Sequence, residues 1–212
     1  ERQMPAWVPN FSGLKASELQ IAAQHIKSQR RLYSEMRIAL ETRGTVEAGG
    51  RLYEQHCRMC HGQDGRGSEM ITLNNQSFLN AADDVFLYKT IVNGRRNTAM
   101  PGWGRLNNQE MAHMLAFLRS WQQKQSPLLP FSLENQKVQT GEQLYHYLCS
   151  RCHGVYGEGS TGPAIINRDF LDVASDAFLA QMIQGGRHNT AMFGWVTDVS
   201  KKEKLSTDQI GD

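Results

Sequence analysis

One five-residue motif, Cys-x-x-Cys-His, occurs twice in this chain of 212 residues. The first copy begins at Cys57 and ends at His61, and the second begins at Cys149 and ends at His153. In a helix this spacing places two thiols about one turn apart, with an imidazole directly after the second thiol. The two copies contain all 4 cysteines of the chain. Any fold of this chain must therefore present the same reactive constellation twice.

Cys-x-x-Cys-His is the attachment signal for haem c. Cys57 and Cys60 can each add to a vinyl group of one porphyrin, and His61 then reaches the iron as the proximal ligand. The same roles for a second porphyrin fall to Cys149, Cys152 and His153. A lone Cys-x-x-Cys also fits a redox dithiol or half of a zinc site. Two copies that each end in His favour two covalently bound haem c groups.

The motifs belong to a longer internal repeat. Residues 46–103 align with residues 138–195 without a gap, at an offset of 149 − 57 = 92, and nearly half of the aligned positions are identical. The most similar block reads Gly-Arg-x-Asn-Thr-Ala-Met-x-Gly-Trp in both copies. We predict a duplicated domain and an N-terminal extension, with the limits 1–45 (extension), 46–122 (first domain), 123–137 (linker) and 138–212 (second domain).

Both repeats are predicted to be helical with the same plan. A short helix runs into each cysteine motif, a glycine-rich loop follows, and a second helix starts at Asp83-Asp84 or Ser175-Asp176, which are good N-terminal signals. This helix ends before Gly94 or Gly186. In the first repeat a last helix is expected over about 108–122, whereas the second repeat stops at 212 with that helix incomplete.

Upstream of the repeats, apolar residues at three- and four-residue spacing predict one long helix from about Ser17 to Arg43. Its charged face is interpreted either as a solvated surface or as a docking surface, over residues 14–44, for a larger assembly or a membrane. The net charge of +2 gives no reason to expect a nucleic-acid partner. No run of about 18 apolar residues is present, so the sequence predicts no membrane span.

Met100 and Met192 occupy equivalent positions in the two repeats, inside the most similar block. A thioether is a soft ligand that stabilises ferrous iron, and a distal ligand must come from a loop on the far side of the porphyrin. We therefore predict that these two residues are the distal ligands. The other methionines within the repeats are expected to fill gaps in the core.

With these residues, each repeat resembles a class I cytochrome c domain, and the chain resembles a dihaem cytochrome c made of two such domains. The resemblance covers residues 46–122 and 138–212 and leaves out the first 45. It implies an all-α fold, with one iron held between His61 and Met100 and the other between His153 and Met192. The Met-containing block is also locally similar to the dihaem subunits of haem–copper oxidases.

The same resemblance implies a proline after each motif, whose carbonyl accepts a hydrogen bond from the proximal histidine. Pro163 fits this role for His153, whereas Ile71 stands at the equivalent position of the first repeat. A backbone carbonyl can serve at either position, but the surroundings of the two histidines are expected to differ. We therefore predict different reduction potentials for the two haems.

Four further residues of the repeated block leave alternatives open. Arg95 and Arg187 are either solvated or charge partners of a haem propionate, since arginine suits carboxylates. Trp103 and Trp195 either pack in the core or donate an indole N–H to a propionate.

Two filled axial positions on each iron leave no site for a substrate, which favours electron transfer over catalysis. The expected protein is a carrier, or the cytochrome subunit of a respiratory or photosynthetic complex, that exchanges electrons with redox-protein donors and acceptors. Because haem c is attached after export, a periplasmic location is expected, with a signal or anchor before Glu1. The alternatives are an enzyme of the dihaem peroxidase or thiosulfate-oxidising type, and a chain that mainly scaffolds a complex.

Overall fold

The computed structural model describes residues 16–67, 71–123, 138–187 and 190–196. The expected irregular N-terminus, nearly all of the linker and the end of the second repeat lie outside these residues. The prediction of an incomplete last helix in the second repeat therefore falls on residues that the structure does not describe.

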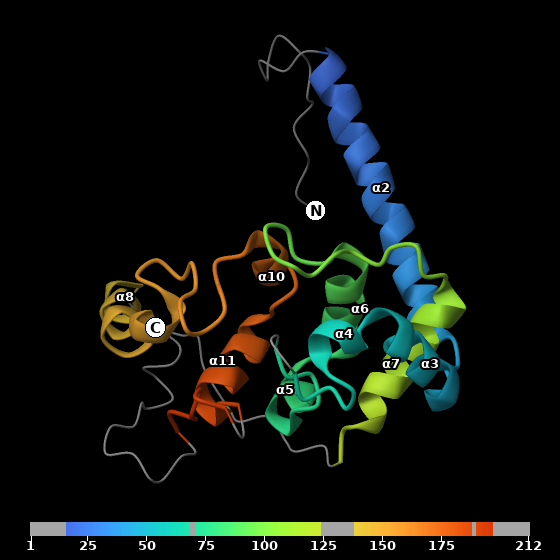
Figure 1. Cartoon of the computed structure of the whole chain (residues 1–212). Helices are drawn as coiled ribbons and strands as arrows, with labels where there is room; N and C mark the ends of the chain where they lie inside the picture. The colour runs from blue at the N-terminus through green and yellow to red at the C-terminus, as the bar shows by residue number, and fades with distance from the viewer. Residues whose placement is uncertain (1–15, 68–70, 124–137, 188–189, 197–212) are drawn as a thin grey trace.

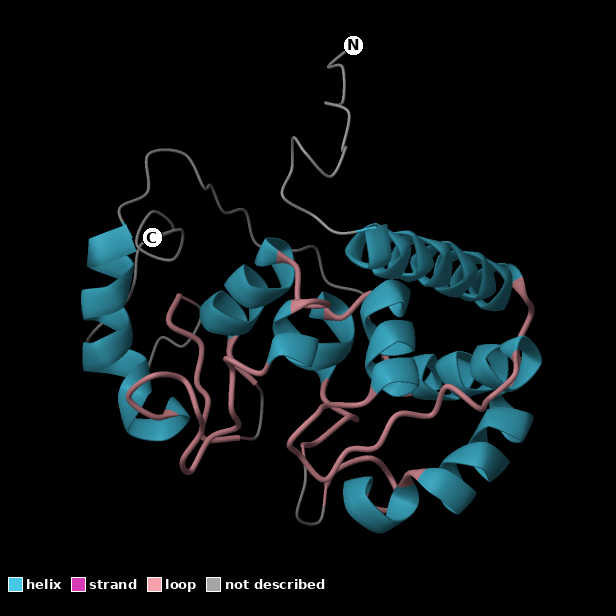
Figure 2. Ribbon diagram, turned by 90° about the horizontal axis from the view of Figure 1, so that it is seen from above, coloured by secondary structure: helices cyan, strands magenta, loops and turns pink. Residues whose placement is uncertain are grey.

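The described residues are helices joined by loops, with no β-strand among them (Figure 2). The extension and first repeat form α2 (Ala16–Glu41), α3 (Val46–His56), α4 (Arg58–His61), α5 (Gln76–Ala81), α6 (Asp84–Asn93) and α7 (Asn108–Ser120). The second repeat forms α8 (Val138–Leu144), the π-helical turn η1 (Tyr145–Cys149), α9 (Ser150–His153), α10 (Arg168–Leu171) and α11 (Asp176–Gly185). The predicted all-α class is confirmed.

Two details of the helices were not part of the predicted plan. The helix that leads into the first motif ends at His56, so that α4 is a separate turn, and in the second repeat η1 widens the helix before Cys149. The short helices α5 and α10 were not expected. Each begins after an asparagine, Asn75 or Asn167, whose side chain accepts a hydrogen bond from the backbone N–H three residues on. This capping pattern in the sequence could have located both helices.

In the first repeat, α7 packs across α3, the helix that leads into the cysteine motif. A side chain at Gly49 would overlap the carbonyl oxygen of His113, so only glycine permits this close approach of the two helices. One turn later, Tyr53 is buried against Phe117 and Trp121, with ring centroids 5.2 Å away in each case. Gly49 and Tyr53 therefore fix the position of α3.

Among the side chains that the structure describes, those that anchor helix α2 lie in its C-terminal part. Met36 and Ala39 are buried in the core and the helix contacts α6 and α7, whereas Tyr33 remains 63% exposed and Ile21 65% exposed. Figure 1 shows α2 extending away from the other helices. Its observed limits lie close to the predicted range of 17–43, but its apolar residues are not all directed at the core.

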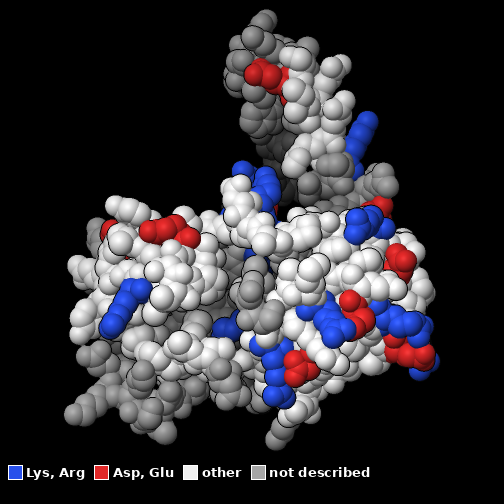
Figure 3. All heavy atoms as spheres, viewed as in Figure 1, with Lys and Arg blue, Asp and Glu red and all other residues white. Residues whose placement is uncertain are grey.

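Basic and acidic side chains lie close to one another on the surface of the protein. Arg51 pairs with Glu47 at 2.6 Å and Arg37 pairs with Glu41 at 3.3 Å, both at a spacing of four residues on exposed helix faces. Figure 3 shows this mixture of basic and acidic side chains on the side of the molecule that carries α3 and α7. Exposed pairs of this kind contribute little to stability.

The two repeats share one hydrophobic core. Phe86 on α6 and Phe178 on α11 occupy equivalent positions and stack with ring centroids 4.5 Å apart and planes at 18°. Phe170 lies 6.5 Å from Phe86, and its equivalent Phe78 lies 6.3 Å from Phe178. The matching distances show that the repeats meet through the same faces, related by an approximate two-fold axis near the stacked pair.

Candidate functional site

The cysteine motifs form single helical turns at the start of each site. None of the cysteines forms a disulfide, so all four thiols are available for thioether bonds. Cys60 and Cys152 are exposed, while Cys57 and Cys149 are partly buried. Burial, with a smaller effect of Cys60, raises the pKa of the Cys57 thiol to about 11, and burial likewise raises the pKa of Cys149. Both thiols therefore stay protonated at neutral pH.

Each motif histidine has one ring nitrogen engaged by a backbone carbonyl. His61 Nδ1 lies 3.0 Å from the carbonyl oxygen of Ile71, and His153 Nδ1 lies 2.9 Å from that of Pro163. A carbonyl can only accept, so Nδ1 carries the proton and Nε2 is left with its lone pair for a metal. Burial lowers the pKa of His61, which favours the neutral ring that ligation requires. Ile71 thus supplies the same acceptor as Pro163.

A tyrosine from the preceding helix holds the loop after each motif. The Tyr53 hydroxyl donates to the carbonyl of Gly62 at 2.8 Å, and the Tyr145 hydroxyl donates to that of Gly154 at 2.7 Å. Burial is the main cause that raises the pKa of both phenols, so both remain donors. Sequence analysis did not identify this role, although the two tyrosines occupy equivalent positions four residues before the first cysteine of each motif.

The described residues of the loops that carry Met100 and Met192 form equivalent hydrogen bonds. In the first, the N–H of Arg95 donates to the carbonyl of Met100 at 3.0 Å, and the N–H of Met100 donates to the Thr98 hydroxyl at 3.2 Å. The equivalent bonds in the second loop measure 2.7 Å and 3.2 Å. Gly94 has φ +65°, and a side chain there would collide with the backbone of Gly102, so glycine closes the loop. Both methionines are partly buried.

Arg95 and Arg187 lie at the interface between the repeats. The Arg95 guanidinium carbon is 4.9 Å from the ring centroid of Phe170, and that of Arg187 is 5.1 Å from the centroid of Phe78. Burial lowers the pKa of both guanidinium groups. This placement excludes the interpretation of these residues as solvated surface arginines. Their predicted contact with a propionate stays a prediction.

The two tryptophans are partly buried beside aromatic neighbours. Trp103 lies 4.6 Å from the His56 ring, with the Arg105 guanidinium carbon 4.4 Å from the centre of its own ring. Trp195 packs beside Phe193 at 4.6 Å. The backbone N–H of each tryptophan donates to the preceding helix, at Ile91 or Ile183. These packing contacts leave the predicted indole–propionate hydrogen bond open.

The residues of both repeats fit a haem group. Each repeat offers two thiols that form no disulfide, an imidazole with a defined tautomer and a thioether, which together form the donor set of a haem c with His and Met ligands. Arg95 Nη1 is buried with no hydrogen-bond partner, which is costly for a charged group unless an anion, such as a propionate, lies beside it. Among the described residues, no cluster of three His, Cys, Asp or Glu side chains offers a metal site of another kind.

The profile of one protein family, described as cytochrome c oxidase, cbb3-type, subunit III, matches the chain twice, over residues 44–118 and 136–206. The two matches together cover more than half of the chain. The chain belongs to this family. Membership identifies it as a c-type cytochrome and implies covalently bound haem c.

Curated relatives agree with this assignment. The cbb3-type cytochrome c oxidase subunit FixP of Sinorhizobium medicae (strain WSM419) is 27% identical over 125 residues, which are 54% of this chain and 41% of that protein. FixP of Bradyrhizobium sp. (strain ORS 278) is 28% identical over 113 residues, 50% of this chain and 36% of that protein. The chain therefore spans less than half the length of the curated relatives that it matches.

Among solved structures, the Kuenenia stuttgartiensis reducing HAO-like protein complex Kustc0457/Kustc0458 is similar with a TM-score of 0.48 and 21% identity, over 79% of this chain and 93% of that one. A likeness of this size carries no argument about function. None of the described helices is both long and apolar enough to cross a membrane.

Proposed function

We propose that this chain is a dihaem electron-transfer cytochrome with one haem c in each repeat. The domain limits proposed for the two haem units are 46–122 and 138–212, joined by 123–137 and preceded by the extension 1–45. Membership of the cbb3-type subunit III family and the repeated donor set support this proposal.

Each repeat would hold its own haem through the same kinds of residue. Cys57 and Cys60, or Cys149 and Cys152, would bind covalently; His61 and Met100, or His153 and Met192, would bind the iron; Arg95 and Arg187 would pair with propionates. Held by these residues, the haem would supply reversible one-electron exchange between ferrous and ferric iron. The chain's own contribution is to fix the ligands, exclude water from the iron and set the charge around it.

The observation that carries this proposal is the near identity of the two sites. Both histidines direct Nδ1 at a carbonyl and leave Nε2 free, and both methionines lie in loops with the same hydrogen bonds. If both irons are closed by His and Met, neither offers a position to a substrate. The dihaem enzyme alternative requires one iron that differs from the other, whereas the described ligand-bearing residues of the two repeats form matching hydrogen bonds.

The relatives are named as subunits of a cbb3-type oxidase, and we propose that this chain likewise serves a membrane complex. The segment 14–44, which contains α2, is the proposed docking element, because Met36 and Ala39 near the C-terminal end of α2 are buried whereas Ile21 and Tyr33 are exposed. The partners would be redox proteins that donate and accept electrons. The proposed location is the periplasm or the outer face of the cytoplasmic membrane, where haem c is attached.

Exposure of the reduced protein to carbon monoxide tests the choice between electron transfer and catalysis. Carbon monoxide needs an iron with an open or weakly held axial position. We expect no change in the visible spectrum of the native reduced protein at neutral pH, and reversible one-electron titration of both haems. Stoichiometric carbon monoxide binding to one haem would favour an enzyme of the peroxidase or thiosulfate-oxidising type instead.

A further inference from the structure

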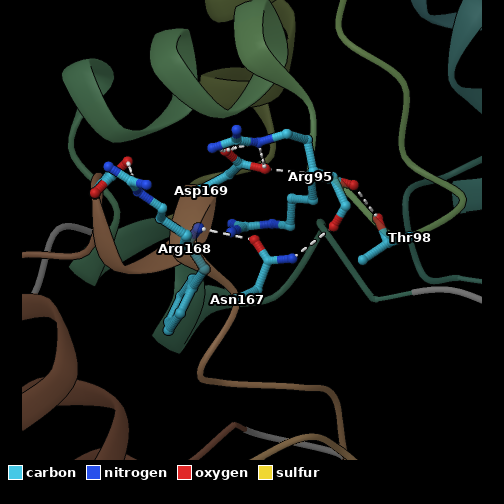
Figure 4. A network of polar contacts seen from close by, with 8 residues as sticks. Arg95, Thr98, Asn167, Arg168 and Asp169 are labelled. Atoms are coloured by element: carbon cyan, nitrogen blue, oxygen red, sulfur yellow. Dashed lines mark hydrogen bonds and ion pairs between the residues drawn. The ribbon is translucent and has the colours of Figure 1, made fainter.

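The approximate two-fold symmetry of the interface is broken at one place. Asp169, at the start of α10 in the second repeat, binds the loop of the first repeat that carries Met100. Its carboxylate accepts from Arg96 Nη2 at 2.6 Å and from Arg96 Nε at 2.9 Å, and it also accepts from the backbone N–H of Arg96 at 2.6 Å. Figure 4 shows Asp169 and Asn167 reaching this loop beside Arg95.

A second residue of the same segment strengthens the contact. Asn167 Nδ2 donates to the carbonyl of Arg96 at 2.8 Å, while the Oδ1 atom of Asn167 accepts from the backbone of Phe170 and so caps α10. The backbone N–H and C=O of Arg96 are therefore both bound by the second repeat. Because the backbone itself is held, the contact restrains the path of the loop and does not merely pair two surface charges.

The first repeat has no carboxylate at the position that is equivalent to Asp169. Ser77 stands in the first repeat where Asp169 stands in the second, and a serine hydroxyl cannot form an ion pair with a loop cation. Arg187, which is equivalent to Arg95, instead donates from Nη2 to the carbonyl of Thr72 at 2.6 Å. The second repeat therefore holds the Met100 loop with a carboxylate that has no counterpart at the equivalent position of the first repeat.

The carboxylate of this ion pair is largely shielded from solvent, whereas the guanidinium is not. The Asp169 side chain is only 10% exposed, whereas that of Arg96 is 67% exposed. Charge-assisted hydrogen bonds with a partly desolvated carboxylate are stronger than an exposed pair of the same geometry. Removal of the carboxylate would also leave the backbone N–H of Arg96 without this acceptor.

We propose that Asp169 is a positioning residue for the iron ligand of the other repeat: it holds the loop that presents Met100 to the first haem. The inference rests on the proposed function, in which Met100 and Met192 are axial ligands. Asp169 contacts Arg96, four residues before Met100, and acts through the backbone of Arg96. The loop that carries the proposed distal ligand of the first haem is thereby held by both repeats.

The test uses the full holoprotein and imidazole, a ligand that binds ferric haem only after the methionine has left the iron. Two parent proteins separate the sites. In Met192→His the second iron gains an imidazole ligand, so the remaining sulfur-ligand absorption band reports Met100. In Met100→His the band reports Met192. Asp169→Asn is introduced into both parents, and the loss of the band is titrated with imidazole.

In the Met192→His parent, Asp169→Asn is expected to tighten the apparent imidazole affinity about tenfold, a factor that corresponds to about 1.4 kcal/mol. In the Met100→His parent, the same substitution is expected to leave the affinity unchanged within about twofold, a difference of about 0.4 kcal/mol. Asp172→Asn serves as the matched control, because it removes the same charge from the same segment and the ion pair of Asp172 is made with Arg168.

Arg96→Gln provides a second variant that leaves Asp169 in place. It removes the guanidinium but keeps the backbone N–H bond, so an intermediate effect on the Met100 site is expected, even if Asp169→Asn fails to fold. An imidazole affinity that Asp169→Asn and Arg96→Gln leave unchanged, or that Asp169→Asn changes equally in both parents, would overturn the inference. A wild-type protein without the sulfur-ligand band would instead overturn the proposed ligation, and this inference with it.

Discussion

Phe86 and Phe178 stack on each other at the centre of the molecule, with ring centroids 4.5 Å apart and planes inclined by only 18°. The two residues are equivalent positions of the internal repeat, and both are buried, at 3% and 5% exposure. The interface between the repeats is thus part of a continuous core and not a contact between two separately completed domains. This relationship makes the stability of each repeat depend on the other.

Phe86→Ala should therefore destabilise both repeats. Truncation of a buried phenylalanine typically costs about 3–5 kcal/mol, and here the loss also removes the stacking with Phe178. We expect the single denaturant transition of the parent to shift to lower denaturant and to split into two, measured by far-ultraviolet circular dichroism. Phe117→Ala is the control, because Phe117 packs against Tyr53 and Trp121 within the first repeat. A Phe86→Ala transition that stays at the denaturant concentration of the parent would contradict a shared core.

Arg95 should raise the potential of a haem next to it. A cation beside the porphyrin disfavours the more positive ferric state, and the buried Nη1 atom of Arg95 has no hydrogen-bond partner among the described residues. Arg95→Gln is expected to lower one midpoint by about 60 mV, the shift of a tenfold change in a one-electron equilibrium. The spectroelectrochemical titration should include Arg37→Gln, a change on the exposed face of α2, as a control. Equal reduction midpoints for Arg95→Gln and the parent would show that Arg95 does not lie next to a haem.

Pro163 can be replaced with little effect, because its backbone carbonyl, not its ring, accepts from His153. In the first repeat the Ile71 carbonyl makes the same bond at 3.0 Å. Pro163→Ala should therefore shift the reduction midpoints of the haems by less than about 30 mV. For comparison, a tenfold change in a one-electron equilibrium shifts a midpoint by about 60 mV.

The neighbouring glycine provides the contrast. A side chain at Gly162 would lie 3.0 Å from the carbonyl oxygen of Cys152 and 3.1 Å from the His153 ring. Gly162→Ala should therefore disturb the ligand and shift one midpoint by more than Pro163→Ala does. The reverse order would show that the proline ring matters more than the carbonyl.

The contact between Asp169 and Arg96 should make stability depend on pH in the acid range. Hydrogen bonds from the Arg96 side chain, followed by that from its backbone, lower the pKa of Asp169 below its ordinary value. A lowered folded-state pKa adds stability that is complete above the unfolded value of about 3.9 and is lost as the pH falls through the folded value.

The measurement is the difference in urea midpoint between the parent and Asp169→Asn across this range. The difference should be constant from about pH 7 to pH 5 and should shrink below about pH 4. A difference that stays constant down to the lowest pH at which the protein folds would show that the Asp169 charge contributes nothing to the contact.

Local sequence patterns were sufficient for the duplicated plan and for most helix limits. The motif at Cys57 and its copy at Cys149 set the register, and the caps at Asp83 and Ser175 both form as predicted, each accepting a bond from a backbone N–H. Such signals depend on residues within one turn of each other, so a single sequence contains them.

The interface between the repeats could not be predicted in the same way. It consists of contacts between residues more than 70 positions apart in the sequence. Examples are the contacts of Arg95 with Phe170 and of Arg96 with Asp169. Nothing in local periodicity shows which apolar face of a repeat is covered by the other repeat. Arg95 and Arg187 were identified as candidates because they repeat, but their position between the two halves emerges only from the fold.

The central claim is that each repeat holds its own iron between its histidine and its methionine, so that both haems are closed and serve electron transfer. Near-infrared magnetic circular dichroism of the oxidised holoprotein, quantified per haem, tests this most directly, because a sulfur–imidazole pair gives a ferric iron a band distinct from that of two imidazoles or an open site. We predict two such bands per chain in the wild type and one each in Met100→His and Met192→His. A wild-type signal from only one sulfur-ligated iron, or from a high-spin iron, would contradict the account.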